Sequence, residues 1–279
     1  MVRPTLNCPC DRRFDEPAFK YDAPPAGETR FDLGAQTYCR AYSRCRLCGH
    51  WYSDHKMDLA NLYSGAYVEN TYGDRMRQTF DRILALPSEK SDNAGRVARI
   101  LTFAEAFFPA GITPTLLDVG SGLGVFPYRM KEAGWSCTAL DPDHRAAVHA
   151  REVIGVQAVT GDFMSIRSDQ LGMFDVITFN KVLEHVEDPV AMLSKASRYL
   201  NPGGFVYVEV PDGEAAASEG PGREEFFIEH HHVFSMASLA MMASRAGFCA
   251  LDIERLREPS TKYTLRTFLG ADSSGSLAG

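Results

Sequence analysis

A glycine-rich segment near the middle of the chain constrains its fold more than any other feature. Leu116 and Leu117 lead through Asp118 and Val119 into alternating glycines at positions 120, 122 and 124. Glycine adopts positive φ and lets the backbone approach a ligand. This pattern therefore predicts a buried strand that turns sharply into a helix, with a ligand against the turn. The N-terminus of that helix would offer unpaired backbone N–H groups to the ligand.

The spacing of these glycines separates the segment from the dinucleotide fingerprint G-x-G-x-x-G. The third glycine of that fingerprint lets helix and strand pack closely, whereas this chain has Val125 at the corresponding position. Its own pattern is D-x-G-x-G-x-G, made by Asp118, Gly120, Ser121, Gly122 and Gly124. This pattern resembles motif I of the class I methyltransferases that depend on S-adenosylmethionine (SAM).

The resemblance continues with two acidic residues that each follow a predicted strand. Asp141, followed by Pro142, ends the second strand, where a carboxylate can accept hydrogen bonds from both ribose hydroxyls. Asp162 and Phe163 follow the third strand. In the family, an Asp at this position binds the adenine amino group, and the next apolar side chain lies against the ring. The resemblance therefore implies that these four residues hold the adenosine part of SAM.

The fourth predicted strand ends at Asn180 and leads into residues 181–186 (KVLEHV), which resemble the family's LEHV segment. Ligands of open α/β sheets lie at the carboxyl ends of the strands, so we expect Asn180 near the methyl group. The resemblance implies a doubly wound, Rossmann-like α/β sheet of seven strands in the order 3-2-1-4-5-7-6, with an antiparallel last strand. After the first strand, the predicted strands are 135–140, 156–159, 174–180, 205–210, 248–254 and 262–269. Periodicity and capping residues predict helices at 74–86, 93–108, 123–133, 143–154, 189–200 and 236–246.

Composition favours a protein that acts on small molecules. The chain has 279 residues, a formal net charge of −7 and a hydrophobic content of 45%, which is ordinary for a globular protein. The acidic balance argues against a nucleic-acid partner, because phosphate binding needs a basic surface. No apolar run approaches the roughly 20 residues that span a bilayer. The N-terminus, MVRPTLNCPCDRR, lacks the apolar stretch of a signal peptide, so we expect a cytoplasmic protein without a membrane partner. The sequence leaves the oligomeric state open.

Five of the seven cysteines lie within the first 48 residues. In a cytosolic enzyme such a cluster favours a metal site over disulfides. Cys45 and Cys48, followed by Gly49, have the form of a zinc knuckle, and Cys8 with Cys10 makes a second candidate pair. Four thiolates would form a closed structural zinc site with no open position for a substrate.

The segment around this knuckle resembles the zinc-binding lead-in of a subset of bacterial methyltransferases. The first pair departs from that pattern because it is C-x-C rather than C-x-x-C, so Cys39, His50 or His55 could replace one of its members. The alternative is that the cysteines carry no metal. The predicted organisation is a zinc-binding segment at 1–60, with a loop or short strand pair at 16–33, a helical lid or linker at 61–110, the methyltransferase domain at 111–270 and a disordered tail at 271–279.

Three side chains are candidates for removing a proton from the methyl acceptor. Glu184 and His185 follow strand four, and the unperturbed histidine pKa of about 6.5 suits proton removal near neutral pH. His231 lies in the segment EHHHVFS, which resembles one that borders the substrate pocket of many small-molecule methyltransferases. In an extended chain His230 and His232 would face one side and His231 the other. Alternatively, these residues position the cofactor loop, cap a helix, or bind a metal together with a neighbouring carboxylate.

The sequence therefore predicts a SAM-dependent methyltransferase. Methyl transfer from a sulfonium needs mainly alignment of the reactants, since the cofactor carries the reactive group. The expected acceptor is a hydroxyl of a sugar, glycan or specialised metabolite. The alternatives are C- or N-methylation of a nucleotide-linked sugar, or a non-catalytic binding or scaffold protein with this fold. A nicotinamide oxidoreductase fits less well, because Val125 and the Asp162-Phe163 pair depart from the dinucleotide pattern.

Overall fold

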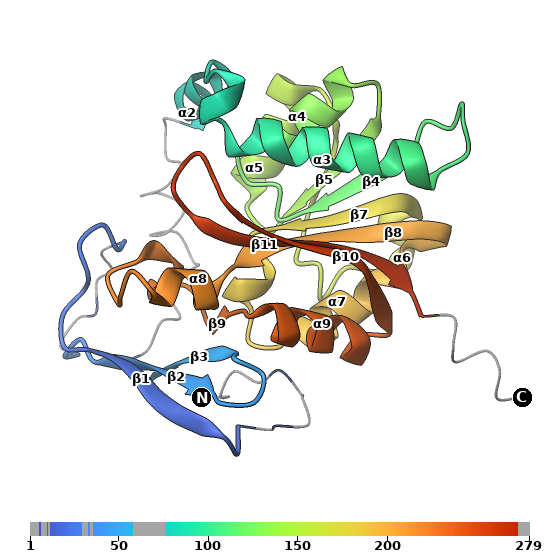
Figure 1. Ribbon diagram of the computed structural model, residues 1–279. Coiled ribbons are helices and arrows are strands. Elements are labelled where there is room, and N and C mark those ends of the chain that lie inside the picture. The colour runs from blue at the N-terminus through green and yellow to red at the C-terminus, as the bar shows by residue number, and fades with distance from the viewer. Residues whose placement is uncertain are drawn as a thin grey trace, which may run out of the picture.

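A computed structural model describes residues 6, 10, 12–29, 33, 36–57 and 76–272 of the chain. The predicted zinc ligand Cys8, the first part of the predicted lid (61–75) and most of the predicted tail (273–279) lie outside the described residues. Two sheets organise the described part (Figure 1). The larger sheet has helices on both faces, and the smaller one is formed mostly by the N-terminal segment.

Seven strands of the described chain form the larger sheet. They are β4 (Thr115–Val119), β5 (Ser136–Asp141), β6 (Gln157–Thr160), β7 (Phe174–Asn180), β8 (Leu200–Pro211), β10 (Phe248–Arg257) and β11 (Tyr263–Ala271). Their order is β10-β11-β8-β7-β4-β5-β6. Strands β4 to β8 pair in parallel, whereas β11 is antiparallel to both β8 and β10. This arrangement confirms the predicted seven-stranded fold.

Helices cover both faces of this sheet, which explains why its central strands are apolar along their length. Val176, Ile177, Val206 and Val208 are fully buried. The helices are α2 (Met76–Leu84), α3 (Asp92–Phe107), α4 (Val125–Glu132), α5 (His144–His149), α6 (Ser168–Leu171), α7 (Pro189–Ala196) and α9 (Met236–Arg245). In Figure 1 the first four lie on one face and the last three on the other. No helix in the described ranges is long and apolar enough to cross a membrane.

Several helix ends follow the predicted capping residues, but the predicted start of the fifth strand was wrong. The side chains of Asp188 and Ser235 accept backbone N–H groups at the starts of α7 and α9, as expected for N-caps. The strand predicted at 205–210 instead begins at Leu200, and its pairing register with β7 shifts before Phe205. The helix predicted at 143–154 changes after His149 into a π-helical stretch, Ala150–Ile154.

The N-terminal segment forms an antiparallel sheet that also includes part of the histidine-rich segment. Its strands β1 (Asp15–Tyr21), β2 (Arg40–Cys45) and β3 (Trp51–His55) pair in sequence order, and β9 (His232–Val233) pairs with β3. The loop or strand pair predicted within 16–33 was therefore wrong, because β1 finds its partner beyond that range. The N-terminal segment therefore pairs with residues that flank the end of β7, the fourth predicted strand.

An apolar cluster fixes this contact between the two sheets. Trp51 of β3 stacks on Phe19 at 5.1 Å between ring centroids and packs with Phe226 and Ala216. Ala216 belongs to α8 (Gly213–Ala217), a short helix that follows β8. Aromatic pairs of this kind contribute about 0.5–1.5 kcal/mol beyond their buried area.

A buried network of charged side chains joins α3 to the centre of the large sheet. Glu209 of β8 is fully buried and accepts hydrogen bonds from Arg96 of α3 and from Arg266 of β11, the latter at 3.1 Å. Arg266 also donates to both carboxylate oxygens of Glu258, at 2.8 and 2.9 Å. Burial alone would raise the pKa of Glu209, but Arg96, Lys181 and Arg266 hold it well below its usual value. Glu209 is therefore ionised and compensates two buried guanidinium groups.

Replacing Glu209 by Ala should destabilise the protein strongly, because it leaves two buried arginines without their shared carboxylate. We expect a loss of about 3–5 kcal/mol in the free energy of unfolding. Asp81→Ala is the matched control, since Asp81 forms an exposed i,i+4 pair with Arg77 and should change stability by less than about 0.5 kcal/mol. Urea unfolding of both variants measures the difference. Equal effects of the two substitutions would contradict the assignment.

Candidate functional site

Two adjoining cavities lie at the carboxyl ends of the parallel strands. The larger, about 560 Å³, extends over the ends of β5 and β6, and we call it the β5 cavity. The smaller, about 370 Å³, extends from the end of β7 toward α3, and we call it the β7 cavity. Gly120, Gly122, Lys181 and His185 line both. A ligand in the β5 cavity would therefore reach the β7 cavity across this shared edge.

The glycine turn between β4 and α4 shapes this shared edge. Gly120 has φ of 71°, and a Cβ there would lie 2.8 Å from a methyl group of Val182. Gly124, with φ of 69°, is the residue from which α4 starts, and a Cβ there would overlap Ile154. The Oγ of Ser121 donates to the carbonyl oxygen of Asp118 at 2.7 Å. Both glycines are thus required by the close packing of the turn, as the sequence pattern predicted.

Asp141 connects this turn to the β5 cavity. Its Oδ2 accepts the backbone N–H of Gly122, and its Oδ1 accepts that of Asp143, both at 2.8 Å. Pro142, Asp162 and Phe163 line the same cavity. Phe163 meets Phe179 edge-on, with the ring centroids 5.6 Å apart. The acidic and aromatic residues that the resemblance singled out therefore share one cavity.

Asp118 lies beneath the turn and joins β4 to β7. Only 2% of its surface is exposed, and its Oδ1 accepts hydrogen bonds from Thr178 Oγ1 at 2.7 Å and from Asn180 Nδ2 at 2.8 Å. Burial raises the pKa of Asp118 to about 6, although the bonds from Thr178 and Asn180 lower it. Asp118 and Asn180 both line the β7 cavity, together with Ser121 and Gly124. All ten predicted cofactor-binding residues thus border one of the two cavities.

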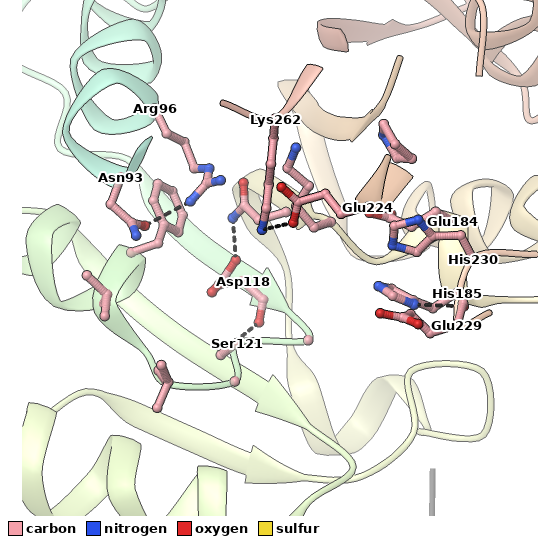
Figure 2. A pocket seen from close by; sticks show the side chains of 18 of the residues that line it. Asn93, Arg96, Asp118, Ser121, Glu184, His185, Glu224, Glu229, His230 and Lys262 are labelled. Carbon is pink, nitrogen blue, oxygen red and sulfur yellow. Dashed lines mark hydrogen bonds and ion pairs between the residues drawn. The ribbon is translucent and has the colours of Figure 1, made fainter. Parts of the chain in front are cut away.

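Glu184, His185 and His230 form a cluster in the β7 cavity (Figure 2). One oxygen of Glu184 and one ring nitrogen of each histidine lie within 4.8 Å of one another. Nδ1 of His185 lies 3.0 Å from the carbonyl oxygen of Glu229, and Nδ1 of His230 lies 2.8 Å from that of Glu225. Burial raises the pKa of Glu184 to about 7 and lowers the pKa of both histidines. Two neutral imidazoles and a buried carboxyl group are therefore presented together.

The structure places His231 away from this cluster, contrary to its predicted role. His231 lines a separate cavity of about 940 Å³ beside the N-terminal sheet, and burial lowers its pKa to about 4. Only its backbone N–H reaches the cluster, by donating to the carbonyl oxygen of Glu184 at 2.8 Å. His230, its neighbour, lines the β7 cavity instead. The alternation of an extended chain separates the two side chains, but sequence reasoning did not establish which one faces the ligand.

The β7 cavity also contains charged residues that the sequence analysis did not select. Arg96 and Lys262 line it, and Lys262 Nζ lies 3.4 Å from a carboxylate oxygen of Glu224. Lys181 follows Asn180 directly, with φ of 60°, and its Nζ donates to Thr264 Oγ1 at 2.5 Å. The one indication in the sequence that Lys181 belongs to this site was its position directly after the end of β7. Arg96 and Lys262 lie in distant segments of the sequence, and no pattern there indicated that they belong to this site.

A family model described as a methyltransferase domain matches residues 72–252. The chain belongs to this methyltransferase domain family. Ubiquinone biosynthesis O-methyltransferase of Caulobacter vibrioides is 36% identical over 101 residues, which are 34% of this chain and 39% of the relative. The protein of the same name from Pseudomonas paraeruginosa is 34% identical over 99 residues, 34% and 43% of the two chains. The chain thus matches about two-fifths of the length of these relatives.

Solved methyltransferase structures share the fold at low sequence identity. The 1,6-didemethyltoxoflavin-N1-methyltransferase of Burkholderia thailandensis, solved with S-adenosylhomocysteine, has a TM-score of 0.55 and 19% identity over 88% of this chain and 99% of its own. The magnesium protoporphyrin IX methyltransferase of Synechocystis, also solved with S-adenosylhomocysteine, has a TM-score of 0.56 and 16% identity over 75% and 98% of the two chains. The large sheet therefore has the fold of class I SAM-dependent methyltransferases.

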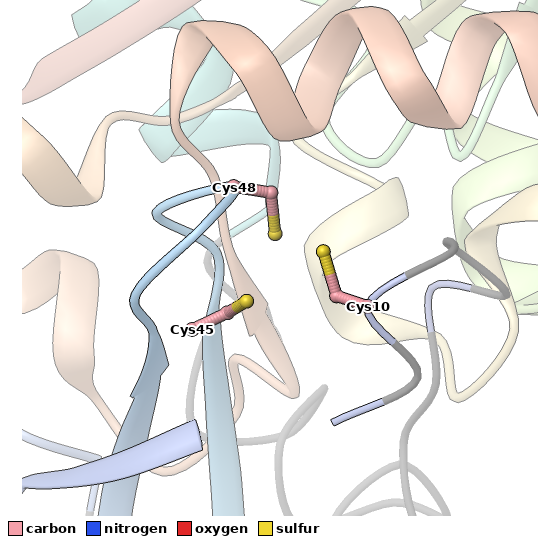
Figure 3. A group of neighbouring side chains, drawn as sticks. All are labelled: Cys10, Cys45 and Cys48. Carbon is pink, nitrogen blue, oxygen red and sulfur yellow. The ribbon is translucent and has the colours of Figure 1, made fainter. Parts of the chain in front are cut away.

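In this methyltransferase, three of the N-terminal cysteines converge (Figure 3). The Sγ atoms of Cys10, Cys45 and Cys48 lie within 4.8 Å of one another, and all three residues are buried. Burial raises the pKa of Cys45, but hydrogen bonds from the backbone N–H groups of Cys48 and Leu47 lower it. The net effect is a pKa below the usual value. Amides that stabilise a thiolate in this way suit a metal ligand.

The alternative zinc ligands that the sequence offered, Cys39, His50 and His55, do not belong to this group of three cysteines. Cys39 is exposed and precedes β2, whereas Cys45 ends that strand. At about 3.3 Å per residue the two lie at opposite ends of it. His50 uses both ring nitrogens, with Nδ1 3.0 Å from Ser238 Oγ and Nε2 2.9 Å from His232 Nδ1. His55, at the end of β3, borders the same cavity as His231.

Proposed function

We propose that this chain transfers the methyl group of SAM to a small-molecule acceptor, and that the acceptor atom is a hydroxyl oxygen. The observation that carries this proposal is the shared edge of the two cavities. The β5 cavity combines Asp141, Asp162 and Phe163, whereas the adjoining β7 cavity is polar and contains ionisable groups. A nucleoside on one side and an acceptor on the other would meet where Gly120 and Lys181 line both.

The residues of the β5 cavity have the chemistry that adenosine needs. The Asp141 carboxylate would accept hydrogen bonds from the ribose hydroxyls, and Asp162 would accept one from the adenine amino group. Phe163 offers an apolar surface to the base. We propose that the buried Asp118 positions the turn by holding Thr178 and Asn180, since its Oδ1 is already occupied by both.

SAM supplies an electrophilic methyl group on a sulfonium, and the chain supplies alignment and proton removal. The cluster of Glu184, His185 and His230 faces the position of the acceptor. Its neutral histidines can receive a proton, and a base with a pKa near the working pH contributes about 10²–10⁴-fold. The name of the curated relatives, O-methyltransferase, supports oxygen as the acceptor atom. N- or C-methylation remains the second candidate, since the similar toxoflavin-pathway structure is that of an N1-methyltransferase.

We further propose a structural zinc ion held by Cys10, Cys45 and Cys48 with a fourth ligand. Three converging buried thiols and a knuckle that ends in Gly49, with φ of 70°, support the site. Cys8 is the fourth ligand that the sequence predicted, and it lies outside the described residues. Such an ion would tie the N-terminus to the loop between β2 and β3.

Asp141→Ala should weaken SAM binding more than tenfold, about 1.4 kcal/mol, while the fold persists. The variant loses charge-assisted bonds to the ribose and the support of the Gly122 N–H. Calorimetric titration with SAM measures the change. Asp169→Ala removes the same charge from an exposed position and should bind SAM like the unmodified protein. Unchanged affinity in folded Asp141→Ala protein would eliminate this assignment.

His185→Gln should lower kcat about 10²–10⁴-fold, because His185 belongs to the cluster that faces the acceptor. His231→Gln is the matched control and should keep kcat, since its side chain faces another cavity. Initial rates with an acceptor from a library of hydroxylated metabolites decide between them. If His231→Gln loses turnover and His185→Gln does not, the assignment of the base is wrong.

Purified protein should contain at least one zinc ion per chain, and Cys45→Ser should lose the one held by the cysteines. Because metal binding is coupled to folding, metal loss should unfold the N-terminal sheet before the methyltransferase domain. Elemental analysis and thermal unfolding give the two readouts. Cys39→Ser should retain both the metal and the wild-type melting curve, since Cys39 is exposed. Absence of zinc from protein purified without chelator would count decisively against the site.

A further inference from the structure

The cluster of Glu184, His185 and His230 contains more ligand groups than proton removal requires. A general base needs one side chain, whereas this cluster brings together two imidazoles and a carboxylate within 4.8 Å. Two histidines and one carboxylate form the donor set of many sites for divalent transition metals, and such sites leave coordination positions open. The side chains come from the end of β7 and from the segment before β9, so the fold itself converges them (Figure 2).

The backbone around the cluster fixes both histidines in the form that binds metal. A carbonyl oxygen can only accept a hydrogen bond, so the proton on each ring must lie on Nδ1, which faces the carbonyl of Glu229 or Glu225. Nε2 of His185 and of His230 therefore carries the lone pair. Metal-binding histidines commonly donate their second ring N–H to a carbonyl, which sets the tautomer and orients the ring.

Glu184 supplies an independent indication of a missing ligand, because one of its carboxylate oxygens is unpaired. Its side chain is only 1% exposed, and its Oε2 has no hydrogen-bond partner among the described residues. A buried carboxylate oxygen without a partner is costly, because it has lost its hydrogen bonds to water. A cation bound by the neighbouring imidazoles would remove that cost.

The surrounding charges permit a cation at this position. Lys262 is paired with Glu224, and the Nζ of Lys181 is directed to the hydroxyl of Thr264 at 2.5 Å. The carboxylate of Glu229 lies in the same cavity and adds negative charge. Arg96, the third basic residue of the cavity, pairs with Glu209. The charges of Lys181 and Lys262 also act on Glu184, and in the described part of the chain they do so without a hydrogen bond to it.

We propose that Glu184, His185 and His230 bind a divalent transition-metal ion in the β7 cavity, and that this ion binds the oxygen atoms of the methyl acceptor. The first part stands on the three side chains alone, and the second rests on the proposed methyl transfer. An acceptor with two neighbouring oxygen atoms, such as a catechol or a vicinal diol, fits an ion with open positions best.

The ion would act by lowering the pKa of the acceptor hydroxyl. The hydroxyl loses its proton to solvent, its oxygen forms the new bond to the methyl carbon, and the bond between that carbon and the sulfonium breaks. The electron pair of the broken bond remains on sulfur, which leaves a neutral thioether. With the ion bound, the histidines would be ligands that orient the acceptor, and this role would replace the proton removal proposed for them above.

Titration with Co²⁺ tests the site directly in full-length protein stripped of metal with a chelator. Ions bound by imidazole and carboxylate give weak d–d absorption, whereas ions bound by the cysteines add intense sulfur-to-cobalt absorption. The two sites are thereby distinguished in one spectrum. The first equivalent of Co²⁺ should fill the cysteine site and restore the N-terminal sheet, and we expect a second equivalent that binds without the sulfur band. His230→Ala and the near-isosteric Glu184→Gln should each weaken this binding at least about tenfold.

His231→Ala is the matched control and should bind Co²⁺ at both sites like the unmodified chain, because His231 faces another cavity. Absence of the second equivalent, or its persistence in both His230→Ala and Glu184→Gln, would overturn the proposal. Acceptor methylation that is fully retained in metal-free protein would refute the role of the ion while leaving the methyltransferase function intact. Co²⁺ binding at this site without any SAM binding would instead uphold the site and refute the function.

Discussion

The geometry of this site depends on one buried carboxylate. Asp118 accepts hydrogen bonds from Thr178 and Asn180, and thereby fixes β4 beside β7 at the level where the glycine turn begins. The glycine turn also directs the backbone N–H of Gly122 to the carboxylate of Asp141, at the end of β5. Short polar contacts thus align the ends of β4, β5 and β7. The shared edge of the two cavities follows from that alignment, because Gly120, Gly122 and Lys181 belong to these same strand ends.

The histidine-rich segment gives the N-terminal sheet a direct connection to this site. His230 lines the β7 cavity, the backbone N–H of His231 donates to the Glu184 carbonyl, and His232 pairs with His50 of the β2–β3 loop. Since β9 also pairs with β3, a displacement of the N-terminal sheet would move the cluster. Most of this sheet precedes residue 72, where the family match begins. The N-terminal segment therefore supports the β7 cavity from outside the matched domain.

Sequence reasoning anticipated the elements whose signals are local. The alternating glycines and Asp141 are local motifs, and they carried the resemblance that implied the order of the large sheet. The partner of β1, the fourth strand β9 and the choice between His230 and His231 depend on contacts between segments far apart in the chain. The pairing of Arg96 with Glu209 spans 113 positions and has no local signature. The Lys262–Glu224 pair at the β7 cavity was missed for the same reason, since its two residues come from separate segments of the chain.

A crystal structure of the protein with S-adenosylhomocysteine tests the central claim most directly. The account predicts the ribose hydroxyls on Asp141, the adenine beside Asp162 and Phe163, and the sulfur at the edge shared with the β7 cavity, facing Glu184, His185 and His230. Adenosine bound outside the β5 cavity, or a sulfur directed away from that edge, would contradict it.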